Sequence, residues 1–198
     1  MDNAIPIRLR DIREADLEAY RDCLHPDRAY HFLNGPYYPG PDTDIITTII
    51  DRCRAKLTDG ESPVLKNKLL IVNDAEELLG EVSWFWKSEE TNWMEIGIVV
   101  FDEGNWGKGI GYAALTRWIS LLFAEHPELV RIGLSTWSGN AGMIGLARKL
   151  GMVEEARYVN ARIVNGEYFD SVSYGIQKAD WVASGLAHHR GDDYTRLQ

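Results

Sequence analysis

The chain has 198 residues, of which 45% are hydrophobic and 26% are charged, a composition that is ordinary for one globular domain. Its net charge of −9 argues against nucleic acid as a main partner, because phosphate binding needs clustered Lys and Arg. No apolar run approaches a membrane span, no signal-peptide core begins the chain, and the two cysteines, Cys23 and Cys53, fit a reducing compartment, so we expect a cytoplasmic protein without a membrane partner.

The first half of the chain predicts a strand, two helices and three further strands. Apolar and polar residues alternate in the first strand, and apolar residues recur at helical spacing in the two helices. A stretch rich in Pro and Gly at residues 34–43 predicts the loop between these helices. The predicted segments are a strand at 5–10, helices at 14–24 and 44–57, and strands at 68–73, 79–86 and 93–100.

The second half predicts two helices that alternate with a strand and are followed by a hairpin. A helix that Gly151 ends precedes the hairpin, whose turn is the dipeptide Asn165-Gly166, a strong hairpin signal. The order of elements indicates an α+β or mixed domain of three layers over residues 1–181, and residues 182–198 lack periodicity and predict a loose tail. The predicted segments are helices at 109–125 and 139–150 and strands at 130–137, 152–164 and 167–177.

A glycine-rich turn between the strand at 93–100 and the next helix predicts an anion site. The turn reads Asn105-Trp-Gly-Lys-Gly-Ile-Gly111, with glycines at alternate positions that let the backbone approach a bulky phosphate. Backbone N–H groups and the helix dipole favour an anion at such a helix start. An ordinary helix entry is the alternative. The glycine spacing departs from the Gly-x-Gly-x-x-Gly of dinucleotide sites, and no Gly-Lys-Ser/Thr of a P-loop is present.

The turn resembles the pyrophosphate loop, Q/R-x-x-G-x-G/A, of the GNAT superfamily of N-acetyltransferases. Trp106 stands where many members have Gln or Arg, which is typical of the RimJ/RimL-like branch. The resemblance extends in order over residues 5–181, through Leu79-Gly-Glu-Val-Ser, Glu95-Ile-Gly-Ile, Leu146-Ala-Arg-Lys-Leu-Gly-Met152 and Asn165-Gly-Glu-Tyr-Phe-Asp170. It implies a mostly antiparallel sheet of about seven strands, splayed between the fourth and fifth, with about four helices in three layers.

The same resemblance implies that the chain binds acetyl-CoA. The glycine turn would donate N–H groups to the pyrophosphate, and the strand before it would bond the pantetheine arm. Asn140 would contact the pantetheine, although an Asn there also fits a plain helix N-terminus. The implied cofactor-binding residues are Ile98, Val99, Val100, Trp106, Gly107, Lys108, Gly109, Ile110, Gly111, Tyr112 and Asn140.

Glu95 is the candidate general base. Attack on a thioester needs a neutral amine, and a carboxylate beside the thioester can take the amine proton. Glu95 lies as far before Gly109 as the fourth-strand glutamate base in the histone acetyltransferase branch that it resembles. The alternative is a strand glutamate that holds an arginine or orders a loop. The expected reaction is acetyl transfer to a primary amine, either a small molecule or a peptide N-terminus, without a metal ion.

Two positions depart from the family pattern. Ala147 and Met143 stand where members carry the Tyr or Ser that protonates the leaving CoA thiolate, so a non-catalytic acyl-CoA-binding sensor or partner protein stays open as the alternative function. Four aromatic residues would line an acceptor pocket by resemblance, or else belong to the core. They are Tyr37, Tyr38, Trp84 and Trp86. The sequence leaves a homodimer open.

Overall fold

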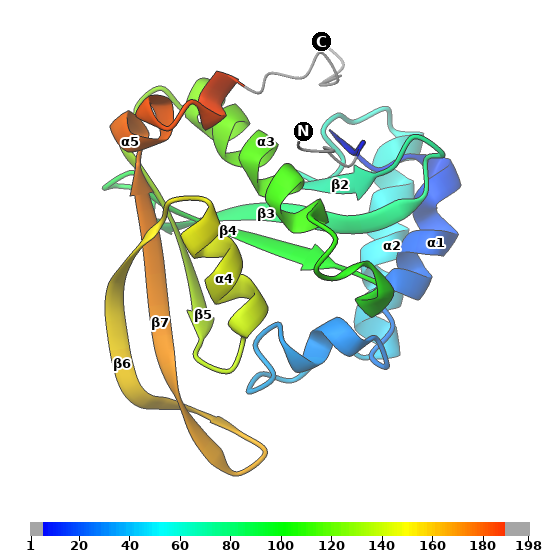
Figure 1. Ribbon diagram of the computed structural model, residues 1–198. Coiled ribbons are helices and arrows are strands. Elements are labelled where there is room, and N and C mark those ends of the chain that lie inside the picture. The colour runs from blue at the N-terminus through cyan, green and yellow to red at the C-terminus, as the bar shows by residue number, and fades with distance from the viewer. Residues whose placement is uncertain (1–5, 189–198) are drawn as a thin grey trace.

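The computed structural model describes residues 6–188 and contains a seven-stranded sheet flanked by helices (Figure 1). The strand order is β1-β2-β3-β4-β5-β7-β6. The strands are β1 (Arg8–Arg10), β2 (Lys68–Val72), β3 (Leu78–Ser88), β4 (Trp93–Val100), β5 (Arg131–Trp137), β6 (Val153–Val164) and β7 (Glu167–Gln177). The α-helices are α1 (Leu17–Cys23), α2 (Thr43–Thr58), α3 (Ile110–Glu125), α4 (Ala141–Lys149) and α5 (Lys178–Ala183). Short 3-10 helices are η1 (Glu14–Asp16), η2 (Ala29–Phe32), η3 (Glu103–Asn105) and η4 (Leu186–His188).

The pairing of β4 with β5 distinguishes the centre of the sheet from the rest. Every other neighbouring pair is antiparallel, whereas β4 and β5 are parallel and pair only at Met94 with Ile132 and at Glu95 with Gly133. Beyond Glu95, β4 stays paired with β3 as far as Val100 but has no partner on β5. The two strands therefore splay, which confirms the fold class that the sequence resemblance implies.

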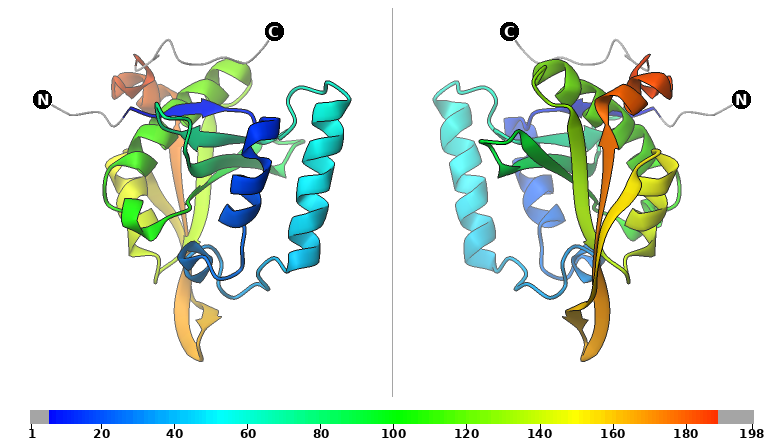
Figure 2. Two further views of the ribbon diagram at one scale, coloured as in Figure 1. Left: turned by 90° about the vertical axis from the view of Figure 1, so that its right-hand side faces the viewer. Right: turned by 90° about the vertical axis from the view of Figure 1, so that its left-hand side faces the viewer.

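The sheet separates two helical layers. Helices α3 and α4 cover one face, and α1 and α2 cover the other (Figure 2). Side chains alternate along β4, so that Met94 and Ile96 pack with α3 around Trp118, whereas Val99 packs in the cluster with Tyr20 of α1. The parity of a residue on β4 thus decides which layer its side chain meets.

Turn chemistry ends the elements as the sequence predicts. Asn165 and Gly166 have φ of 51° and 82°, the left-handed pair that a two-residue hairpin turn requires. Gly151 has φ of 79°, and the N–H groups of Gly151 and Met152 donate to the carbonyls of Arg148 and Ala147, which closes the end of α4.

The C-terminal segment packs further than the sequence pattern indicates. Helix α5 is not among the predicted helices, yet Trp181 is buried and its Nε1 donates to Ser120 Oγ of α3 at 3.1 Å. Leu186 and Ala187 of η4 also pack against the core, so this part of the predicted tail lies on α3. The rest of the predicted tail, from residue 189, lies outside the described residues. Within residues 6–188, no helix has both the length and the hydropathy that crossing a membrane needs.

Two glycines of the α4 region should respond oppositely to alanine. Gly151→Ala should lower the free energy of unfolding by about 1–2 kcal/mol, because alanine resists the left-handed conformation. Gly145 lies exposed inside α4 with open space at its missing Cβ, so Gly145→Ala should raise that free energy by about 0.5–1 kcal/mol. Urea unfolding of both variants measures the difference, and equal effects would show that the αL cap does not limit stability.

Candidate active site

A helix follows each of the two strands that splay. After β4 the chain passes through η3 and the glycine turn into α3, and after β5 it passes through Asn140 into α4 (Figure 1). Each helix therefore starts just beyond the end of one of the two diverging strands. Because helix N-termini present unpaired N–H groups and a positive dipole end, this edge of the sheet can hold an anion.

The glycine turn carries a row of unused donors. Gly107 and Gly109 have φ of 73° and 88°, and Gly109 is an N-cap that supplies no side chain. The N–H groups before the turn are bonded, and the N–H of Ala113 donates to the carbonyl of Gly109 at 3.0 Å. Among the described residues, the N–H groups of residues 107–112 meet no hydrogen-bond acceptor. The predicted anion site thus has free donors at the start of α3.

Trp106 fastens the turn to the strand. Its indole Nε1 donates to the carbonyl of Val100 at 2.9 Å, so this side chain holds the turn against the end of β4. The first turn of α3 is in turn covered by α4, because Lys149 Nζ lies 4.5 Å from the ring centroid of Tyr112. The glycine turn is thus attached to β4 through Trp106, and the start of α3 to α4 through Tyr112.

Asn140 joins three segments. It is the N-cap of α4, where its Oδ1 accepts from the N–H of Met143 at 3.0 Å. Its Nδ2 donates to the carbonyl of Leu33 at 3.2 Å, and Trp137 Nε1 donates to the same carbonyl at 2.9 Å. The loop after η2 is therefore tied to the end of β5, a contact between distant segments for which the sequence carries no signal.

The carboxylate of Glu95 lies at the last residue pair before the splay. Its side chain is only 3% exposed, and its Oε1 accepts from Ser135 Oγ of β5 at 3.2 Å. Ser135 Oγ lies 3.0 Å from Ser173 Oγ of β7, and Ser135 is exposed. Among residues 6–188, Glu95 makes no ion pair, so of the two alternative roles the one that holds an arginine does not apply, and the one that orders a loop stays open.

The predicted acceptor residues do not all meet at Glu95. Trp84 and Trp86 pack on the α3 face, where their rings lie 5.5 and 5.7 Å from that of His126. Phe85, between them, is the register partner of Glu95 and is 47% exposed on the opposite face. The register of β3 against β4 decides that Phe85, and not Trp84 or Trp86, shares the face of Glu95. The alternation of side chains along one strand does not decide it.

The other two predicted acceptor residues lie on the loop between η2 and α2. The ring of Tyr37 lies 4.6 Å from the guanidinium of Arg162, which connects that loop to the β6–β7 hairpin. Tyr38 is largely exposed and its ring packs edge-on against Tyr37. The acceptor role of this loop stays a prediction, and the sequence did not single out Phe85, Ser135 and Ser173, which lie around Glu95.

Neither of the two positions at which the family resemblance implies a thiolate donor carries a hydroxyl. Ala147 is fully buried and Met143 is half-buried beside the core. In the described part of the chain, no group of three or more His, Cys, Asp or Glu side chains is arranged to hold a metal ion.

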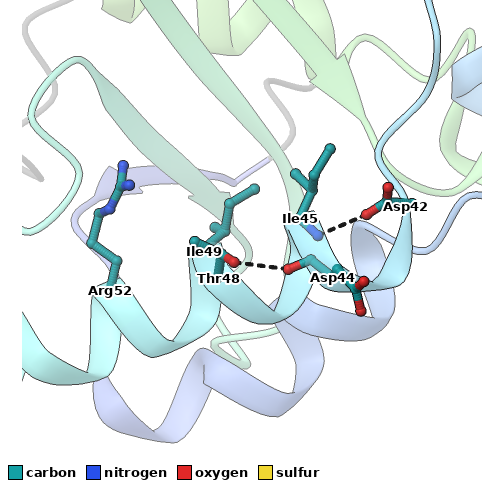
Figure 3. Close-up of a pocket in the computed structure, with 6 residues that line it drawn as sticks. All are labelled: Asp42, Asp44, Ile45, Thr48, Ile49 and Arg52. Atoms are coloured by element: carbon teal, nitrogen blue, oxygen red, sulfur yellow. Dashed lines mark hydrogen bonds between the residues drawn. The ribbon is translucent and has the colours of Figure 1, made fainter.

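A separate surface hollow lies on α2 (Figure 3). Asp42 Oδ1 accepts from the N–H of Ile45 at 2.8 Å and Thr48 Oγ1 donates to the carbonyl of Asp44 at 2.9 Å, so its polar groups stabilise the helix itself. None of the predicted site residues lines it. Its lining consists of Asp42, Asp44, Ile45, Thr48, Ile49 and Arg52.

Comparison with known proteins agrees with this geometry. The family model of the acetyltransferase (GNAT) domain matches residues 7–153. The chain is 33% identical over 87 residues to YdaF of Bacillus subtilis (strain 168), whose name assigns it to the ribosomal N-acetyltransferases. That match covers 44% of this chain and 46% of YdaF, so it spans less than half of the relative.

Two solved structures share the fold. One is a GNAT-family acetyltransferase from Bacillus anthracis, with a TM-score of 0.68 and 17% identity. The other is the spermidine N-acetyltransferase of Vibrio cholerae in complex with CoA and spermine, also with a TM-score of 0.68 and 17% identity. Each similarity covers 89% of this chain and 98% of the other. At this identity the likeness shows the fold alone.

Variants of Asn140 should separate its two bonds. Asn140→Ala should lower the free energy of unfolding by about 1–2 kcal/mol, because the cap of α4 and the bond to Leu33 are both lost. Asn140→Asp keeps an acceptor for the Met143 N–H but loses the amide donor, so its loss should be smaller while limited proteolysis between residues 28 and 42 becomes faster. Unchanged proteolysis in Asn140→Asp would show that Trp137 alone holds the loop.

Proposed function

This chain belongs to the GNAT acetyltransferase family, and from that membership we propose that it transfers an acetyl group from acetyl-CoA to a primary amine. Acetyl-CoA is the cofactor that enzymes of this family use. The observation that carries the proposal is the row of unbonded N–H groups at residues 107–112, which lies at the splay that begins at Glu95.

The glycine turn would bind the pyrophosphate of acetyl-CoA. The free N–H groups of residues 107–112 supply donors without side-chain rearrangement, and the exposed Lys108 would add about 0–1 kcal/mol at the rim. Backbone N–H groups can bind the pyrophosphate without the help of a metal ion. The dipole of α3 favours the same charge.

The open edge of β4 would bind the pantetheine arm. Backbone groups of alternate strand residues face the same side, and the Val100 carbonyl that accepts from Trp106 marks the side away from β3. Ile98 shares that side, so its N–H and carbonyl are free for a ligand in the splay. Val99 directs its backbone to β3 and would contribute contact rather than hydrogen bonds.

Glu95 would act as the base. The amine attacks the thioester carbonyl, which a backbone amide of β4 polarises, and the proton of the amine passes to the carboxylate. Ser135 Oγ lies 3.2 Å from Glu95 Oε1, and Ser173 Oγ lies 3.0 Å from Ser135 Oγ. This chain of hydroxyls offers the proton a route to solvent. Burial of the carboxylate makes such a route useful, because Glu95 itself meets little water.

The acceptor is proposed only as a class, a primary amine of a small molecule or a peptide N-terminus. The net charge of −9 favours a cation in solution. The names of two similar proteins cover both classes of acceptor: one is a spermidine N-acetyltransferase, whose substrate is a small polyamine, and the other is named as a ribosomal N-acetyltransferase. Two free cysteines agree with a cytoplasmic location, and a homodimer stays a prediction that sedimentation can check.

An amine panel tests the proposal. Purified protein with acetyl-CoA is mixed with polyamines, aminoglycosides and peptides with free N-termini, and release of free thiol is followed. Turnover with any amine supports acetyl transfer. Binding of acetyl-CoA by calorimetry without any turnover would favour the alternative, a non-catalytic acyl-CoA sensor that the residues Ala147 and Met143 motivate. Absence of CoA binding would exclude both.

Gly109→Val should weaken CoA binding. A side chain at this left-handed residue crowds the pyrophosphate, so calorimetry should give a Kd about tenfold higher or more, which corresponds to about 1.4 kcal/mol. Gly60→Val is the matched control, because Gly60 has φ of 71° at the end of α2, away from the turn. Equal Kd values in the two variants would leave the turn a purely structural feature.

Glu95→Gln should lower kcat and change its pH dependence while the Kd for CoA stays nearly constant. The amide keeps the size and the bond to Ser135 but cannot take a proton at ordinary pH, so a loss of about 100-fold in kcat is expected. Ser135→Ala should leave Glu95 in place and give a smaller loss. An unaltered pH–rate profile in Glu95→Gln removes Glu95 as the base.

A further inference from the structure

The departing CoA thiolate lacks a proton donor at the family positions, and the helix η2 supplies a candidate. The ring of Tyr30 in η2 lies 5.8 Å from that of Phe101, which follows the end of β4. Three residues after Tyr30, the carbonyl of Leu33 accepts from Trp137 at the end of β5. The segment therefore reaches from the end of one splayed strand to the end of the other.

This segment lies on the same face of the sheet as Glu95. Residues of odd number on β4 share the Glu95 face, and Phe101 continues that series. Glu95 is paired with Gly133, so Ser135 and Trp137 share the face on β5. Since η2 contacts both Phe101 and the Trp137 end, it covers the splay from the side to which the carboxylate of Glu95 belongs. Figure 1 shows this short helix beside the end of β4 and the start of α4.

His31 stands in the middle of η2 with an unsatisfied ring nitrogen. Its Nε2 is buried and has no hydrogen-bond partner among the described residues, while its ring packs against Tyr30 at 4.1 Å between centroids. Buried polar atoms are almost always paired, so an unpaired one needs an explanation. The other two unpaired nitrogens belong to Arg117 and Arg162, whose guanidinium groups bond through other atoms.

We propose that His31 protonates the sulfur of the departing CoA, an assignment that rests on the proposed acetyl transfer. The amine nitrogen forms a bond to the acetyl carbon, the C–S bond breaks with its electron pair on sulfur, and the proton on His31 Nε2 moves to that sulfur. Glu95 receives the amine proton, and exchange with water restores both side chains, so the reaction remains amine and thioester to amide and thiol. A histidine imidazolium is a stronger acid than a thiol by about two pKa units.

The first test observes the ring directly. The ¹⁵N signal of His31 Nε2 is recorded by NMR in the wild-type protein, free and saturated with CoA or with desulfo-CoA. A shift with CoA that desulfo-CoA does not reproduce is expected, because only the sulfur meets the nitrogen. His25, exposed and bonded to Asp27 on the same segment, should not move. Identical His31 shifts with both ligands overturn the proposal, whether or not any amine is turned over.

The second test is kinetic. His31→Gln should lower kcat by about 100-fold with little change in KM for acetyl-CoA, and the alkaline limb of the pH–rate profile, on which a required acid loses its proton, should disappear. His25→Gln is the matched control and should keep the wild-type values. Circular dichroism checks that both variants fold. If folded His31→Gln has the kcat and the pH profile of the wild-type protein, the proposal is overturned. If the wild-type protein turns over and the folded variant is about 100-fold slower, the proposal is supported.

Discussion

The early end of the β4–β5 ladder is the constraint on which the site depends. Only two residue pairs join these parallel strands, and the backbone of β4 beyond Glu95 keeps β3 as its single neighbour. An open strand edge inside a sheet exposes donors and acceptors that would otherwise be satisfied. The start of α3 follows this open edge, and its unbonded N–H groups and helix dipole favour an anion there.

The two faces of the sheet contribute different chemistry to this opening. The α3 side carries the glycine turn, which Trp106 ties to Val100 and whose N–H groups stay unbonded. The opposite side carries Glu95, its hydroxyl neighbours and the segment around η2. In the proposed reaction a donor held from one side thus meets acid–base groups on the other. The Leu33 carbonyl, which follows η2, accepts a hydrogen bond from Asn140, the N-cap of α4, and so joins this segment to that helix.

Several features were readable from single residues. Alternate glycines at 107–111 predicted a turn that opens a helix, and Asn165-Gly166 predicted a hairpin turn; the backbone angles agree in both cases. The prediction was incomplete where packing decides. Trp84 and Trp86 have the size of pocket residues, but the register of β3 against β4 turns Phe85 and not the tryptophans toward Glu95. A shift by one residue would have exchanged the two outcomes.

The sequence by itself determined the seven strands and the four longer helices, the left-handed glycines and the likeness to an acetyltransferase family, because these follow from local backbone preferences and motif spacing. Only the tertiary structure decided which side chains surround the splay. Glu95 with Ser135, and Leu33 with Trp137 and Asn140, come from segments 40, 104 and 107 residues apart. No periodicity encodes such contacts, since strand order and loop docking depend on the packing of the whole core.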